Sequence, residues 1–204
     1  MTTDLKPSDA TDAACTPLLL FSNGDCRISL SRRGEAMPFY TRHVDGDLLC
    51  FVHTGAGLLE TEFGPLRYRV GDWIYLPKAC TGRQVPDAEA TLLMVEATDE
   101  FRVPPPGPLG RHFPFDPSQA TIPEPAPIDD DGRDEYEVLL VHEGGPTSLY
   151  YQHNPMDVEG WCGDNFPFTF NIADYNVVAS ESVHLPPAAG AASDGVRQPV
   201  RGRS

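Results

Sequence analysis

The sequence predicts an all-β sandwich or barrel with a second, incomplete β region. Three observations predict this class. The chain is built of short runs with strand character that stop at turn residues, and no window sustains a helical period. Its 21 prolines and 18 glycines make up nearly a fifth of the 204 residues, which fits many short strands joined by turns.

The first β region is predicted over residues 17–102, after a polar, disordered tail at residues 1–16. The run 18–21 ends at Asn23-Gly24, a dipeptide favoured in tight hairpin turns. Further strand-like runs cover residues 48–53, 58–63, 66–70, 73–76 and 91–97. Each ends at a turn or a proline except the run 91–97, which closes the series.

The rest of the chain is predicted to consist of three parts. Residues 103–128 are rich in proline, which cannot donate ladder hydrogen bonds, so they form a crossing segment or a linker. Residues 129–187 form a partial second β region, with strand-like runs and an aromatic-rich stretch. Residues 188–204 lack aromatic residues and turn basic, which predicts a disordered, atypical tail.

Composition excludes several classes of function. The formal charge of −15 repels phosphate backbones and anionic membranes, so we expect neither nucleic acid nor a membrane as a partner. No run approaches the ~20 apolar residues of a membrane span. The five cysteines form no Cys-x-x-Cys pair, which argues against a disulfide framework or a zinc knuckle. We therefore expect reduced thiols and a soluble, cytoplasmic protein.

The order strand, Gly-x-Gly turn, strand, Gly-Asp and strand ending in Pro77 resembles the two motif regions of the cupin superfamily. Metal-binding cupins place two histidines and a carboxylate in the first region and a third histidine after the proline of the second. Thr41 occupies the first histidine position, His43 and Asp47 could fill the next two, and the third histidine position falls near Gly82 or Arg83.

Only two of four ligand positions are thus suitable. One interpretation is a metal held by His43 and Asp47, because imidazole and carboxylate are ligands of Fe(II). The other interpretation is structural, with Asp45-Gly46 as a turn and His43 as a hydrogen-bonded histidine at a strand end. The sequence favours the structural one, and no bound metal is predicted here.

An ordered series of motifs resembles the N-terminal part of the homogentisate 1,2-dioxygenase family, and the resemblance spans roughly residues 17–187. Each motif alone is weak, but their order is specific. They are Phe39-Tyr-Thr-Arg-His-Val-Asp-Gly-Asp47, Leu59-Glu-Thr-Glu-Phe-Gly64, Gly107-Pro-Leu-Gly110 with Phe115-Asp-Pro117, Asn154-Pro-Met-Asp-Val-Glu-Gly-Trp-Cys-Gly163, Phe166-Pro-Phe-Thr-Phe-Asn171 and His184-Leu-Pro-Pro187.

The resemblance implies a cupin fold and an Fe(II) enzyme that opens the ring of a small dihydroxyphenylacetate with O2, in tyrosine and phenylalanine catabolism. It also implies a metal-free N-terminal β domain and a C-terminal cupin with a two-His, one-Glu iron site. In the family the iron ligands lie downstream of the segment that matches residues 184–187. No residue after Pro187 matches, so we expect the iron-ligand segment to be missing and the chain to be inactive alone.

His184 is the one candidate catalytic residue, because the resemblance places it at the histidine that leads into the family's active-site region. Its alternative role is a turn histidine before Pro186-Pro187. Three functions remain open: a ring-cleaving dioxygenase lacking its catalytic half, a non-catalytic cupin-like binding or scaffold module, and a small metal cupin that uses His43 and Asp47. Open sheet edges in an incomplete β region also predict self-association.

Overall fold

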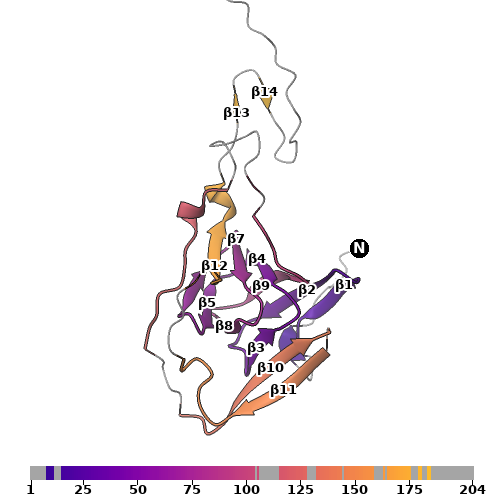
Figure 1. The fold of residues 1–204 in the computed structure, drawn as a ribbon, viewed down its shortest axis with the longest axis vertical. Helices are drawn as coiled ribbons and strands as arrows, with labels where there is room; N and C mark the ends of the chain where they lie inside the picture. Colours follow the sequence, from indigo (N-terminus) through magenta and orange to yellow (C-terminus); the bar gives the residue numbers. More distant parts are fainter. Residues whose placement is uncertain are drawn as a thin grey trace, which may run out of the picture.

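Two six-stranded sheets pack face to face in the computed structural model, and a separate pair of strands follows (Figure 1). The structure describes residues 8–11, 15–103, 105, 115–127, 132–143, 145–158, 163, 165–175, 179–180 and 183–184. Helical structure in these residues is limited to three short 3-10 turns, which are η1 (Asp9–Thr11), η3 (Pro117–Gln119) and η4 (Ile172–Asp174). The predicted all-β class, with strands arranged in two packed sheets, is confirmed.

The first sheet has the order β1-β2-β9-β4-β7-β12, and all its pairings are antiparallel. The predicted hairpin at Asn23 joins its first two strands, and the Asn23 side chain accepts hydrogen bonds from the backbone of Asp25 and Cys26. In sheet order the strands are β1 (Leu18–Ser22), β2 (Cys26–Arg33), β9 (Ala90–Ala97), β4 (Leu48–Thr54), β7 (Asp72–Leu76) and β12 (Phe168–Asn171).

The second sheet has the order β11-β10-β3-β8-β5-β6, and its one parallel pairing joins β10 to β3. In sheet order the strands are β11 (Gly145–Tyr151), β10 (Tyr136–His142), β3 (Tyr40–His43), β8 (Thr81–Pro86), β5 (Gly57–Thr61) and β6 (Leu66–Tyr68). A two-stranded sheet of β13 (Ala179–Ser180) and β14 (Val183–His184) stands apart from both.

Strands from both predicted β regions share the two main sheets. The hairpin β10–β11 extends the second sheet beside β3, and β12 extends the first sheet beside β7. The proline-rich crossing reaches the same edge, because Thr121 bridges Thr169 of β12. The later strands are therefore paired through the backbone with the first region.

The core lies between the two sheets, where alternate side chains of β4, β5 and β7 are buried. The alternating pattern is clearest in β4 and β7, whose inward residues include Leu48, Val52 and Ile74. Gly55 makes the turn after β4 possible: its φ is +83°, and a Cβ there would lie 2.6 Å from the backbone of Ala90.

Candidate functional site

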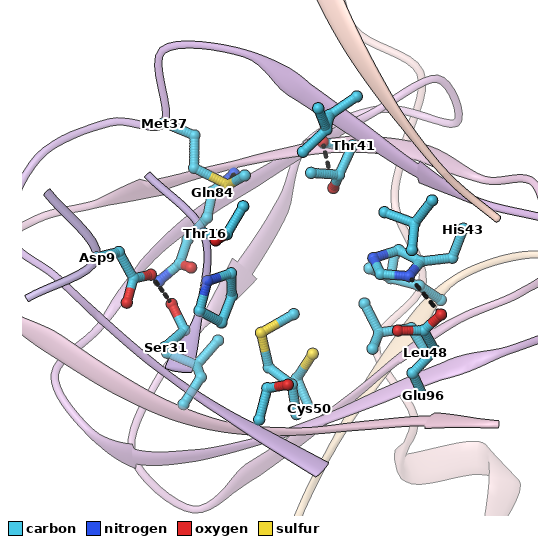
Figure 2. Close-up of a pocket in the computed structure, with 18 of the residues that line it drawn as sticks. Asp9, Thr16, Ser31, Met37, Thr41, His43, Leu48, Cys50, Gln84 and Glu96 are labelled. Atoms are coloured by element: carbon cyan, nitrogen blue, oxygen red, sulfur yellow. Dashed lines mark hydrogen bonds and ion pairs between the residues drawn. The ribbon is translucent and has the colours of Figure 1, made fainter. Parts of the chain in front are cut away.

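A cavity of about 260 Å³ lies between the sheets (Figure 2). Its walls are mainly apolar and come from both layers, with Leu48, Cys50 and Ile74 on the first sheet and Leu139 on the second. Pro17 and Pro146, from the β1 and β11 sides of the sandwich, also line it. The fold thus leaves space where a β-sandwich normally packs side chains together.

Strand β2 gives this cavity one polar wall. Four residues at alternate positions point into it and line it, and they are Arg27, Ser29, Ser31 and Arg33. The apolar residues Ile28 and Leu30 occupy the alternate positions, which face the other way because side chains alternate along a strand. The polarity of β2 is therefore reversed relative to an ordinary core strand.

One end of the polar wall is closed by Asp9. The Ser31 hydroxyl donates a 2.6 Å hydrogen bond to its Oδ2, and the Arg32 backbone N–H donates a 2.9 Å bond to its Oδ1. The Arg33 guanidinium lies 3.4 Å from Oδ2, and both side chains of this ion pair are almost fully buried. Asp9 therefore departs from the expectation that residues 1–16 form a disordered tail: a buried carboxylate with three donors fixes this part of the chain.

The other end holds His43 and Glu96. Glu96 Oε1 lies 3.5 Å from Nδ1 of His43 (Figure 2). Its Oε2 lies 3.8 Å from Nε of Arg27. The His43 contact has the distance of an ion pair but not the geometry of a hydrogen bond, so Nδ1 is buried without a hydrogen-bond partner in the described part of the chain. The cavity is thus flanked by two pairs of opposite charge.

Asp47 belongs to a different environment from His43. Its carboxylate accepts hydrogen bonds from the Tyr75 hydroxyl (2.9 Å) and from the backbone N–H groups of Lys78 (2.7 Å) and Phe101 (2.8 Å). Burial, and then the hydrogen bond to Asp47, raise the pKa of Tyr75. Asp47 is buried and does not line the cavity. Its carboxylate anchors two loops rather than joining His43.

The remaining cupin ligand positions are used for strand pairing. Thr41 and Gly82 are opposite each other in the pairing of β3 with β8, and the Thr41 hydroxyl donates to the Gly82 carbonyl at 3.3 Å. Arg83 pairs with Glu60 at 2.7 Å. Among the residues that the structure describes, no three or more His, Cys, Asp or Glu side chains are grouped to hold a metal. These residues do not fit an iron site, which takes two imidazoles and a carboxylate.

His184 is described only through its backbone, which pairs with Ala179 in the β13–β14 sheet. Its side chain lies outside the described part of the structure, as do the predicted tail at residues 188–204 and most of the prolines between 104 and 114. A catalytic role for His184 stays a prediction.

Sequence reasoning missed the polar wall of the cavity and the carboxylates at its two ends, which are Asp9, Arg27, Ser29, Ser31, Arg33 and Glu96. One signal was available, namely the alternation of polar residues at positions 27, 29, 31 and 33. Such alternation marks a two-faced strand, but it does not say which face turns inward. Cys50, on β4, also lines the cavity, and burial of its side chain raises the pKa of the thiol to about 12.

No helix in the described residues is long and apolar enough to cross a membrane.

Comparison with known proteins points to dioxygenases. The family model described as "Homogentisate 1,2-dioxygenase N-terminal" matches residues 30–172. A provisionally named dioxygenase of Saccharolobus solfataricus is 26% identical over 191 residues, covering 90% of this chain and 48% of that protein. Homogentisate 1,2-dioxygenase of Emericella nidulans is 25% identical over 150 residues, covering 72% of this chain and 33% of that enzyme. The chain thus spans about half or less of the length of these relatives.

Similar solved structures include small cupins and a dioxygenase. A cupin-2 domain protein of Shewanella frigidimarina is 16% identical, with a TM-score of 0.37 over 40% of this chain and 79% of that one. Salicylate 1,2-dioxygenase of Pseudaminobacter salicylatoxidans is 17% identical, with a TM-score of 0.34 over 39% of this chain and 26% of that one. The family match covers well over half of the chain, so this protein belongs to the homogentisate 1,2-dioxygenase N-terminal family.

Proposed function

We propose that this chain is the metal-free β domain of an Fe(II)-dependent, O2-using dioxygenase of the homogentisate type. The family match over residues 30–172 carries the proposal. The activity assigned to it is ring cleavage of a small aromatic substrate in tyrosine and phenylalanine catabolism, in the cytoplasm. The domain would contribute a rigid β framework to that enzyme.

The contacts of the cupin ligand positions support a metal-free domain. Asp47 directs its carboxylate to three protein donors, and Thr41 and Gly82 take the places of two histidines. Turning Asp47 away from these donors would leave three part-buried groups without their acceptor, which opposes its use as a metal ligand. The third option, a small metal cupin using His43 and Asp47, is therefore less favoured than a metal-free domain.

The test measures iron and oxygen together. The chain is purified without oxygen, loaded with Fe(II), freed of excess metal and assayed for bound iron, and homogentisate is then added while O2 uptake is followed. Homogentisate 1,2-dioxygenase of Emericella nidulans, treated in parallel, shows that the loading and the assay work. We expect far less than one iron per chain and no O2 uptake.

About one iron per chain with O2 uptake would contradict this proposal. His43 and Asp47 would then be the first residues to replace, and His184 the next, since His184 is the candidate for a supporting or acid–base role. A second function, a non-catalytic cupin-like binding or scaffold module, is favoured by the cavity between the sheets. It is compatible with an absence of iron and turnover.

A further inference from the structure

The cavity is too large to be a packing defect. Protein interiors are packed to crystal-like density, and voids larger than a water molecule are few. At about 30 Å³ for each liquid water, 260 Å³ corresponds to roughly nine waters. The same volume lies just below the range of about 300–1,000 Å³ of pockets for drug-sized ligands. The space therefore suits a molecule the size of a single ring.

The middle of the polar wall has hydrogen-bonding capacity that the described residues leave unused. The inward positions of β2 carry Ser29 in the middle, between the flanking ion pairs. Its hydroxyl is only partly buried and has no hydrogen-bond partner among the described residues. A strand whose polar side chains face inward buries less apolar surface than an ordinary core strand. Such departures from an otherwise consistent pattern concentrate at functional sites.

Charge selects the kind of ligand. Both cations on the wall already face a carboxylate: Arg33 lies 3.4 Å from Asp9, and Arg27 lies 3.8 Å from Glu96. An anionic ligand would therefore meet no unneutralised arginine and would be buried beside Glu96 and Asp9, at a high desolvation cost. A neutral molecule with one hydroxyl avoids that cost.

The rest of the lining selects an apolar body. Leu48, Ile74 and Leu92 line the cavity from the same sheet as β2, and Leu139 lines it from the second sheet. Met94, beside Ser29 on β9, adds a thioether that makes favourable contacts with aromatic rings. We propose that the cavity binds a small, uncharged monocyclic molecule of the phenol class, with its ring between the sheets and its hydroxyl paired with Ser29. This site does not depend on the ring-cleaving function, because it uses no metal.

Binding is measured by calorimetry and by methyl and amide chemical shifts of the whole chain, with phenol, toluene and phenylacetate as probes at pH 7.5. We expect saturable phenol binding, with shift changes confined to cavity residues such as Leu92 and Leu139. Toluene should bind at least about fivefold more weakly because it leaves Ser29 unpaired, and phenylacetate more weakly still because it is charged.

Two variants fill the cavity: Ser29→Phe and Met94→Trp. Each should weaken phenol binding at least about tenfold. Ile28→Phe is the matched control, since it adds the same ring to the outward face of β2 and should leave binding unchanged. Ser29→Ala keeps the volume and should remove the preference for phenol over toluene.

Absence of saturable phenol binding to the wild-type chain would overturn the proposal. So would phenylacetate binding as tightly as phenol, because the site would then not select uncharged ligands over anions. Shift changes away from the cavity, or equal binding by wild type and both filled variants, would also overturn it. None of these results alters the iron and oxygen measurement, so the two proposals can fail separately.

Discussion

Asp9 and Ser31 are joined by a 2.6 Å hydrogen bond across 22 residues of sequence. The bond ties the segment before β1 to the inward face of β2, and it lies beside the buried pair formed with Arg33. A short polar segment is thereby held against the sandwich by one carboxylate. Asp9 also helps to close one end of the cavity.

Replacing Asp9 with alanine should therefore destabilise the whole domain. Removing one partner of a buried ion pair costs about 3–5 kcal/mol, because the remaining charge stays buried and unpaired. We expect Asp9→Ala to lower the free energy of unfolding by an amount in this range in urea titrations. Asp25→Ala is the control, since Asp25 is exposed in the β1–β2 turn, and it should change stability by less than about 0.5 kcal/mol. Equal effects would show that Asp9 is not anchored.

Asp47 should behave as a structural carboxylate. Its three donors come from Tyr75, Lys78 and Phe101, so alanine leaves three part-buried donors without their acceptor. A fully buried donor left unsatisfied costs about 1–3 kcal/mol and a part-buried one less, so we expect a total loss of about 2–3 kcal/mol on Asp47→Ala. Asp99→Ala, at an exposed carboxylate, provides the comparison. A near-neutral Asp47→Ala would indicate that water replaces the carboxylate and that the anchor is dispensable.

The buried thiol of Cys50 predicts how stability depends on alkaline pH. Burial raises its pKa from 9.0 to about 12, so between these values the unfolded chain loses a proton that the folded chain keeps. The unfolded state is then favoured, and the free energy of unfolding falls as the pH rises from about 9 toward 12. The slope approaches about 1.4 kcal/mol per pH unit for this group.

The check is a series of urea titrations under reducing conditions at pH 8, 9, 10 and 10.5. Cys50→Ala should lose stability at every pH because it enlarges the cavity, but its alkaline slope should be shallower than that of the wild type. Tyr68, whose pKa is raised to about 12 mainly by burial, contributes the same sign in both proteins. Parallel slopes would mean that the Cys50 thiol ionises normally in the folded chain.

The strands that the sequence predicts well are those with an ordinary core pattern. Residues 48–53 and 73–76 correspond to β4 and β7. Their side chains alternate toward a buried face, and the second run ends at a proline. Strand β2 was not predicted because its inward positions are polar, and β8 was not predicted because its buried residues include Thr81, Gly82 and Gln84. In both, neighbouring strands override what the residues alone indicate.

The candidate site was predictable only in part for the same reason. His43 was identified from its motif position, and the structure places it at the cavity. Its neighbour Glu96 lies 53 positions later on β9, and no local spacing links them. Asp9 was assigned to a tail because its segment is short and polar, and its burial arises from contacts with β2. Such long-range pairings depend on strand order, which periodicity does not give.

Self-association is expected at the edge strand β1. This strand pairs only with β2 among the described strands, and it exposes Leu19 and Phe21, of which Phe21 is 69% exposed. An unpaired edge with exposed apolar residues is a template for another chain.

Phe21→Lys places a charge on that edge and should shift the chain toward the monomer in sedimentation velocity over a concentration series. Val103→Lys adds the same charge at an exposed apolar residue outside the strands and should leave the distribution unchanged. If both variants shift it equally, net charge rather than the β1 edge controls assembly; if neither does, the contact lies elsewhere.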